Sequence, residues 1–158
     1  MIEFLDLPDG WEQYKVASGS YCYVLAGDKI EQLLQETYKR AGLCLKVFDR
    51  PNADDIEHLD IEHIIEEARV QNTFSLFGIA PVVYRIVILS IRRVALVVEN
   101  EQGTDNPDMY LAHLLVKKFN LRSRNITTEK AQIEKFDFLT PANWAGDKFV
   151  DFGGWYFG

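Results

Sequence analysis

The stretch LCLKVF at residues 43–48 is an apolar run interrupted by one lysine, Lys46. Apolar and β-branched residues at these positions predict a short strand. A lysine inside such a strand is costly to bury unless a carboxylate or a ligand phosphate pairs with it. In an edge strand the same lysine would face water, and the stretch alone leaves both alternatives open. Lys46 is therefore the first candidate functional residue.

The segments around this run predict hairpins and amphipathic helices. Apolar residues at three- and four-residue steps indicate helices, whereas β-rich runs beside Gly/Ser turns indicate hairpins. Hairpins with one long helix predict an α+β domain with an antiparallel sheet. The connector at 99–108 and the segment 120–135 are polar, and the latter is ambiguous. The predicted elements are a hairpin at 11–25, a helix at 28–40, a helix from 56 to about 77, strands at 82–89 and 93–98, a helix at 109–119 and a short hairpin around 146–147.

Composition and charge exclude several classes of protein. The chain has 158 residues, with 17 Lys plus Arg against 24 Asp plus Glu and a net charge of −7. An acidic surface argues against nucleic acid as a partner. No apolar run approaches the ~20 residues of a membrane span, and residues 1–6 lack the basic start of a secretory signal. Two cysteines, Cys22 and Cys44, are too few for a disulfide framework or a zinc site, which favours a cytoplasmic location.

Residues 15–24, KVASGSYCYV, resemble the glycine-rich loop of the protein-kinase superfamily. In the pattern G-x-G-x-x-G-x-V, Gly19 takes the middle glycine and Val24 the valine. Ala17 and Cys22 replace the other two glycines. The loop chemistry requires amides that approach phosphates closely, which glycine permits. An ordinary hairpin turn is the alternative interpretation.

The next two matches concern Lys46 and a helical glutamate. LCLK at 43–46 resembles the strand motif V-A-I-K, whose lysine pairs with a glutamate on the following helix. Glu66 and Glu67 both lie there. Glu67 opens a passage, residues 67–84, that resembles the helix-to-strand connection of small-molecule and other atypical kinases. The alternative is a solvated acidic helix face.

The last third of the chain supplies the remaining matches. Asp151-Phe152-Gly153 follows two apolar strand residues, as the metal-binding D-F-G motif does in kinases. Upstream, residues 137–143, DFLTPAN, resemble the catalytic loop, with Asp137 as its aspartate and Asn143 as its asparagine. The spacing between the two is six residues rather than five, and the family's histidine and arginine do not precede Asp137.

The resemblance implies a protein-kinase-like fold and a nucleotide site. It predicts an N-lobe at 1–98, formed by an antiparallel sheet and a long helix. A hinge and an abbreviated C-lobe would follow at 99–158, ending just after D-F-G, in a chain cut from a longer protein. The implied function is binding of ATP and Mg²⁺, with phosphoryl transfer to an acceptor in the complete protein. The implied residues are Asp137, Lys46 and Glu67 for catalysis, Gly19, Ser20, Val24, Lys46 and Glu99 for the nucleotide, and Asn143 and Asp151 for magnesium.

A second interpretation belongs to another class of protein. The missing loop glycines and the altered catalytic loop favour a non-catalytic, pseudokinase-like module that binds a partner or regulates an attached enzyme. The chain also resembles domains found at the N-terminus of larger bacterial enzymes, methyltransferases among them. The sequence leaves the acceptor and the partner unnamed.

Overall fold

The computed structural model describes residues 2–18, 22–49, 61–100, 106–123, 138–153 and 155–158. The chain divides into two compact units. The first unit comprises Met1–Leu59 and Val83–Glu101, and the second comprises Asp60–Val82 and Gln102–Gly158. These units differ from the expected division between residues 98 and 99, because residues 60–82 group with the later part of the chain. The division into kinase-like lobes stays a prediction.

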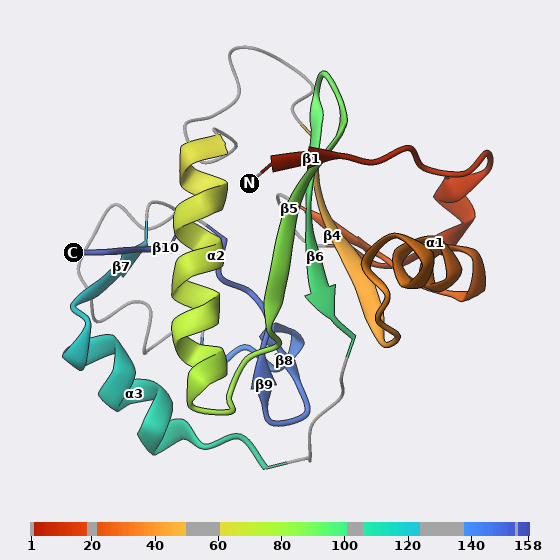
Figure 1. Ribbon diagram of the computed structural model, residues 1–158. Coiled ribbons are helices and arrows are strands. Elements are labelled where there is room, and N and C mark those ends of the chain that lie inside the picture. Colours follow the sequence, from red (N-terminus) through yellow and green to blue (C-terminus); the bar gives the residue numbers. More distant parts are fainter. Residues whose placement is uncertain (1, 19–21, 50–60, 101–105, 124–137, 154) are drawn as a thin grey trace. The chain divides into compact units, whose positions relative to one another are not determined.

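A six-stranded sheet forms the first unit (Figure 1). Its neighbours are antiparallel except β1 and β5, which run parallel. The α+β class with a mostly antiparallel sheet is therefore confirmed. In spatial order the strands are β1 (Ile2–Phe4), β5 (Val83–Ser90), β6 (Arg93–Glu99), β4 (Leu43–Asp49), β3 (Tyr23–Leu25) and β2 (Lys15–Ser18).

Helix α1 (Asp28–Tyr38) covers one face of this sheet. Acidic residues in its first turn, Asp28 and Glu31, suit the positive end of the helix dipole. Its buried residues Ile30 and Leu34 belong to one apolar cluster with the alternate β4 residues Leu43, Leu45 and Val47. Because strand side chains alternate between faces, Lys46 lies on the face opposite α1.

The second unit contains α2 (Ile61–Leu76) and α3 (Met109–Lys118). Helix α2 ends in a Schellman motif: the Gly78 amide donates to Ser75 at 3.0 Å and the Ile79 amide to Phe74 at 3.3 Å. Gly78 has φ 77°, which glycine adopts without strain, so the predicted helix end is confirmed. Helix α3 is capped by Asp108, whose carboxylate accepts from the Leu111 amide at 3.0 Å.

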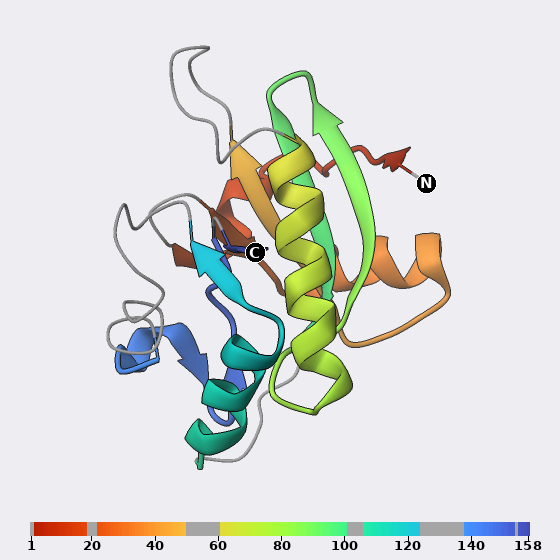
Figure 2. The ribbon, with the colours of Figure 1, turned by 90° about the vertical axis from the view of Figure 1, so that its left-hand side faces the viewer.

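Short strands and an aromatic core complete the second unit. Helix α3 leads into β7 (Leu121–Ser123), which pairs with β10 (Trp155–Phe157) (Figure 2). A separate hairpin joins β8 (Trp144–Ala145) to β9 (Lys148–Phe149), directly after a 3₁₀ turn at Pro141–Asn143. The largest members of the core are Phe74, Phe138, Phe149, Phe152 and Trp155.

One local prediction needs correction, and three strands were not predicted. Residues Trp11–Tyr14 form a 3₁₀ turn rather than the start of the first hairpin. Strand β1 was not predicted, and neither were β7 and β10, which lie in segments interpreted as polar or as loop. The first turn of the helix predicted from residue 56 lies outside the described residues.

Candidate functional site

Lys46 lies in the interior of the sheet, on a strand with neighbours on both sides. In the β3–β4 and β4–β6 registers it stands opposite Val24 and Leu96. Directly opposite residues on antiparallel strands share a face, with Cβ atoms about 5 Å apart. The structure therefore brings together two predicted nucleotide residues, Lys46 and Val24, on the face that α1 leaves uncovered.

Lys46 is buried, which removes the edge-strand alternative. Only 7% of its surface is exposed, and its Nζ lies 5.8 Å from the centre of the Phe48 ring on the same face. Cys44 is the next residue on this face. Burial raises the pKa of the Cys44 thiol to about 12, with the Glu31 charge adding to the shift and the Lys46 charge opposing it. Cys44 is therefore a neutral thiol at physiological pH.

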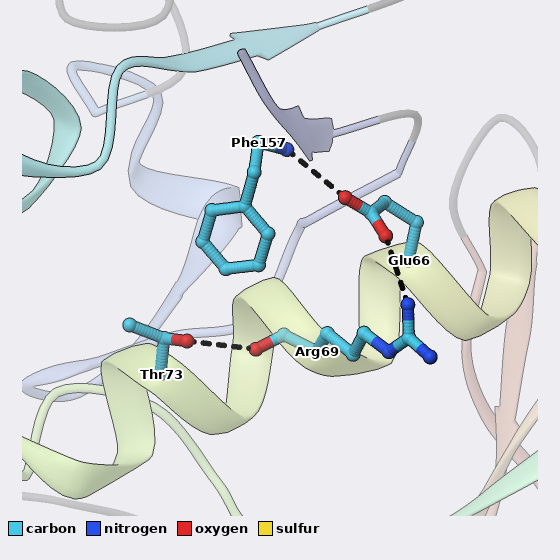
Figure 3. Close-up of polar contacts among 4 residues, drawn as sticks. All are labelled: Glu66, Arg69, Thr73 and Phe157. Carbon is cyan, nitrogen blue, oxygen red and sulfur yellow. Dashed lines mark hydrogen bonds and ion pairs between the residues drawn. The ribbon is translucent and has the colours of Figure 1, made fainter.

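The two glutamates of α2 have different environments. Glu67 is 2% exposed, whereas Glu66 is half-buried. Glu66 accepts a hydrogen bond from the Phe157 amide at 3.1 Å and pairs with Arg69 at 3.6 Å (Figure 3). The carboxylate of Glu66 is thus already bound to groups of the second unit. Glu67 is the better candidate to pair with the buried Lys46. Lys46 and Glu67 belong to different units, so their pairing stays a prediction.

The β8–β9 hairpin brings the two predicted magnesium residues to neighbouring positions. Trp144 pairs with Phe149, and the Val150 amide donates to the Asn143 carbonyl at 2.9 Å. Asp151 directly follows Val150 in the sequence, and it is exposed. The Gly153 amide donates to Asp151 Oδ1 at 3.4 Å, which restrains the carboxylate.

The chemistry of this pair suits a hard cation. Carboxylate and amide oxygens are ligands that Mg²⁺ accepts, and Mg²⁺ commonly takes one or two protein ligands with water and phosphate oxygens for the rest. Within the described residues, no group of three or more His, Cys, Asp and Glu side chains is placed to hold a metal ion.

The predicted hinge is part of the sheet. Glu99 is the last residue of β6 and stands opposite Leu43. The next amide, that of Asn100, donates to the Gly42 carbonyl at 2.8 Å. The Asn100 amide is therefore engaged in a backbone hydrogen bond next to the end of β6.

Gly19, Ser20 and Asp137 lie outside the described residues, so their predicted roles stay predictions. One polar residue that the sequence did not single out is Gln71, which is 2% exposed and four residues after Glu67. Its Nε2 donates to the Pro81 carbonyl at 2.8 Å. The spacing of four from Glu67 was the available signal, because residues i and i+4 share a helix face.

A second polar cluster lies in the first unit. Asp49 accepts from Tyr23 Oη at 3.0 Å and from Arg93 Nε at 2.7 Å. Burial, followed by the Asp49 charge, raises the pKa of Tyr23, so its hydroxyl stays protonated. The Arg93 guanidinium also lies 4.6 Å from the Trp11 ring. These contacts tie three strands to the 3₁₀ turn and serve the fold.

Comparison with known proteins does not assign the chain to a family. No protein-family model matches the chain, and no curated protein sequence matches it. No helix of the described residues is long and apolar enough to cross a membrane.

Proposed function

We propose that this chain is a kinase-like nucleotide-binding domain that serves ATP- and Mg²⁺-dependent phosphoryl transfer in the complete protein. The observation that carries the proposal is the buried Lys46 directly opposite Val24. A buried ammonium group is costly unless anionic groups pair with it, and the phosphates of a nucleotide are groups of this kind. The hairpin that places Asn143 beside the residue before Asp151 gives independent support.

Each residue has a role in this proposal. Lys46 contacts the α- and β-phosphates and is oriented by Glu67. Asn143 and Asp151 hold Mg²⁺, which neutralises charge on the transferred group. The remaining roles are phosphate cover by the loop at Gly19 and Ser20, adenine binding by the hinge at Glu99, and orientation of the acceptor hydroxyl by Asp137.

Thermal denaturation with Mg-ATP tests the proposal. A ligand that binds only the folded state stabilises it, by about 2.7 kcal/mol at ~100 times its dissociation constant. We expect Mg-ATP to raise the melting temperature, and Lys46→Met and Asp151→Asn each to abolish the increase. Lys117→Met and Asp9→Asn change exposed residues of the same types and should keep it.

The second candidate is a non-catalytic kinase-like module. It is favoured by Ala17, which occupies a glycine position of the loop and lies in β2 opposite Val24. A side chain there restricts how closely a phosphate approaches the backbone. No change in melting temperature at millimolar Mg-ATP would overturn the nucleotide proposal and favour this module.

A further inference from the structure

The segment that follows Asp151 is attached to α2 at two levels. The first attachment is aromatic. Phe74 of α2 meets the rings of Phe152 and Trp155 edge-on, at centroid distances of 5.2 and 5.9 Å. All three side chains are buried in the core of the second unit.

The second attachment is polar and lies toward the helix start. Strand β10 pairs with β7, and Phe157 stands opposite Leu121. The Phe157 amide donates instead to the carboxylate of Glu66, whose other oxygen faces Arg69 (Figure 3). A strand amide turned away from its partner strand is thus satisfied by a helix side chain.

The two attachments hold α2 at two levels. Buried rings that meet edge-on hold the helix near Phe74. A hydrogen bond between a carboxylate and a fixed backbone amide is directional. Glu66 and Phe74 are eight residues, or about 12 Å, apart along the helix. Together the two contacts therefore fix the rotation of α2 relative to the Asp151 segment.

That rotation decides which glutamate is buried. Successive residues of a helix are about 100° apart around its axis, so a rotation of one residue would exchange Glu67 for Glu66. With Glu66 bound to Phe157, the buried position belongs to Glu67, which is 2% exposed.

We propose that Glu66 is a positioning residue: by holding the Phe157 amide it fixes the rotation of α2 and so couples the placement of Glu67 to that of Asp151. This inference rests on the proposed nucleotide site. Coupling between two parts of a site commonly changes affinity 5- to 150-fold. A moderate effect is expected here, because the aromatic attachment remains when Glu66 is replaced.

Four variants of the whole chain test the coupling, with Mg-ATP affinity measured by titration calorimetry. Glu66→Ala removes the acceptor and should weaken binding roughly 5- to 10-fold. Glu66→Gln keeps a carbonyl oxygen for the Phe157 amide and should stay within about twofold of the native chain. Arg69→Gln removes only the ion pair and should also stay within about twofold. Val116→Ala removes buried side-chain atoms of α3 and leaves the Glu66 contacts in place, so it should leave the affinity of the folded protein unchanged.

Hydrogen exchange at the Phe157 amide separates the outcomes. Exchange should accelerate in Glu66→Ala and not in Glu66→Gln, whether or not nucleotide is present. Faster exchange with unchanged Mg-ATP affinity would overturn the coupling while the nucleotide site stands. Equal losses in Glu66→Ala and Glu66→Gln would also overturn it. Failure of the native chain to bind Mg-ATP would instead remove the proposed function and, with it, the role of Glu66.

Discussion

At the scale of single residues, Gln71 links α2 to the chain that leads into β5. Its Nε2 donates to the Pro81 carbonyl at 2.8 Å, and its side chain is 2% exposed. Within the described part of the chain, its Oε1 has no hydrogen-bond partner. The bond to Pro81 fixes which way the amide points, because the reverse orientation would place two oxygens together.

We predict that Gln71→Ala lowers the free energy of unfolding by about 1–3 kcal/mol. The substitution leaves the buried Pro81 carbonyl without its donor and opens a small cavity. Urea denaturation followed by circular dichroism measures the change. Gln32→Ala is the matched control, because Gln32 is exposed on α1 and its amide donates to the exposed Glu36. A change within about 0.5 kcal/mol is expected there. Equal effects of the two variants would contradict the prediction.

The candidate site was predictable where a residue type conflicts with its surroundings. The single lysine in LCLKVF marks Lys46 as a candidate from the sequence alone, and the structure decides between the two alternatives that the sequence left open, because Lys46 is buried. The residue type of Gln71 does not conflict with its surroundings in the sequence, because glutamine is common in exposed helix positions. Its burial is known only from the structure. The hairpin geometry of Asn143 and Asp151 follows from a turn around Gly146 that the sequence did predict.

At the scale of elements, β10 closes the aromatic core of the second unit. Trp155 is 1% exposed, and its ring lies 5.2–5.9 Å from the rings of four phenylalanines. The strand also pairs with β7, and the Gly158 amide donates to the Asn120 carbonyl at 3.0 Å. Strand pairing and core packing therefore depend on the same three residues.

We predict that Trp155→Ala lowers the free energy of unfolding by about 3–5 kcal/mol, the usual cost of emptying a buried aromatic position. It should also accelerate hydrogen exchange at the amides of β7, since β10 loses its anchor. Trp155→Phe keeps a ring at the position and should cost clearly less in both measurements. A loss below about 1 kcal/mol in Trp155→Ala would show that β10 does not close this core.

The elements that were predicted from the sequence are those whose apolar residues recur with a helix or strand period. The helices at 28–38 and 109–118 and the hairpin of β5 and β6 repeat apolar residues over many positions. Strands β1, β7 and β10 have three residues each, too few for a period. Each forms a strand because it pairs with a segment distant in the sequence. Strand β10, for example, pairs with β7, with residue 155 opposite residue 123. Local propensity holds no information about such a partner.

At the scale of the whole chain, the sequence did not reveal how the elements are shared between the two units. Helix α2 lies in the sequence between two strands of the first unit, β4 and β5, yet it groups with the second unit. Amphipathic spacing shows that a helix buries a face but does not identify what covers that face. The two compact units are consequently a result of tertiary packing.

Two weak acids of the first unit, Cys44 and Tyr38, make the stability of the chain depend on pH in the alkaline range. Burial raises the pKa of Cys44 from 9.0 to about 12, and burial together with the Glu3 charge raises that of Tyr38 from 10.0 to about 12. Both groups are neutral in the folded chain at a pH where the unfolded chain ionises them. Their contribution to stability is complete below about pH 9 and disappears between pH 9 and 12, because the unfolded state then binds fewer protons than the folded state.

We therefore predict that the free energy of unfolding falls as the pH rises from 9 to 12, and that Cys44→Ala makes this fall shallower. One group contributes at most about 1.4 kcal/mol per pH unit, and for Cys44 most of that is expected because the thiol is buried. Urea denaturation at half-unit pH steps measures the slope. Cys22→Ala is the matched control, since Cys22 is only half-buried and its removal should leave most of the slope in place. Identical slopes in the two cysteine variants would contradict the assignment, because the fall would then come from the tyrosines or from the growing negative charge of a chain that already carries −7.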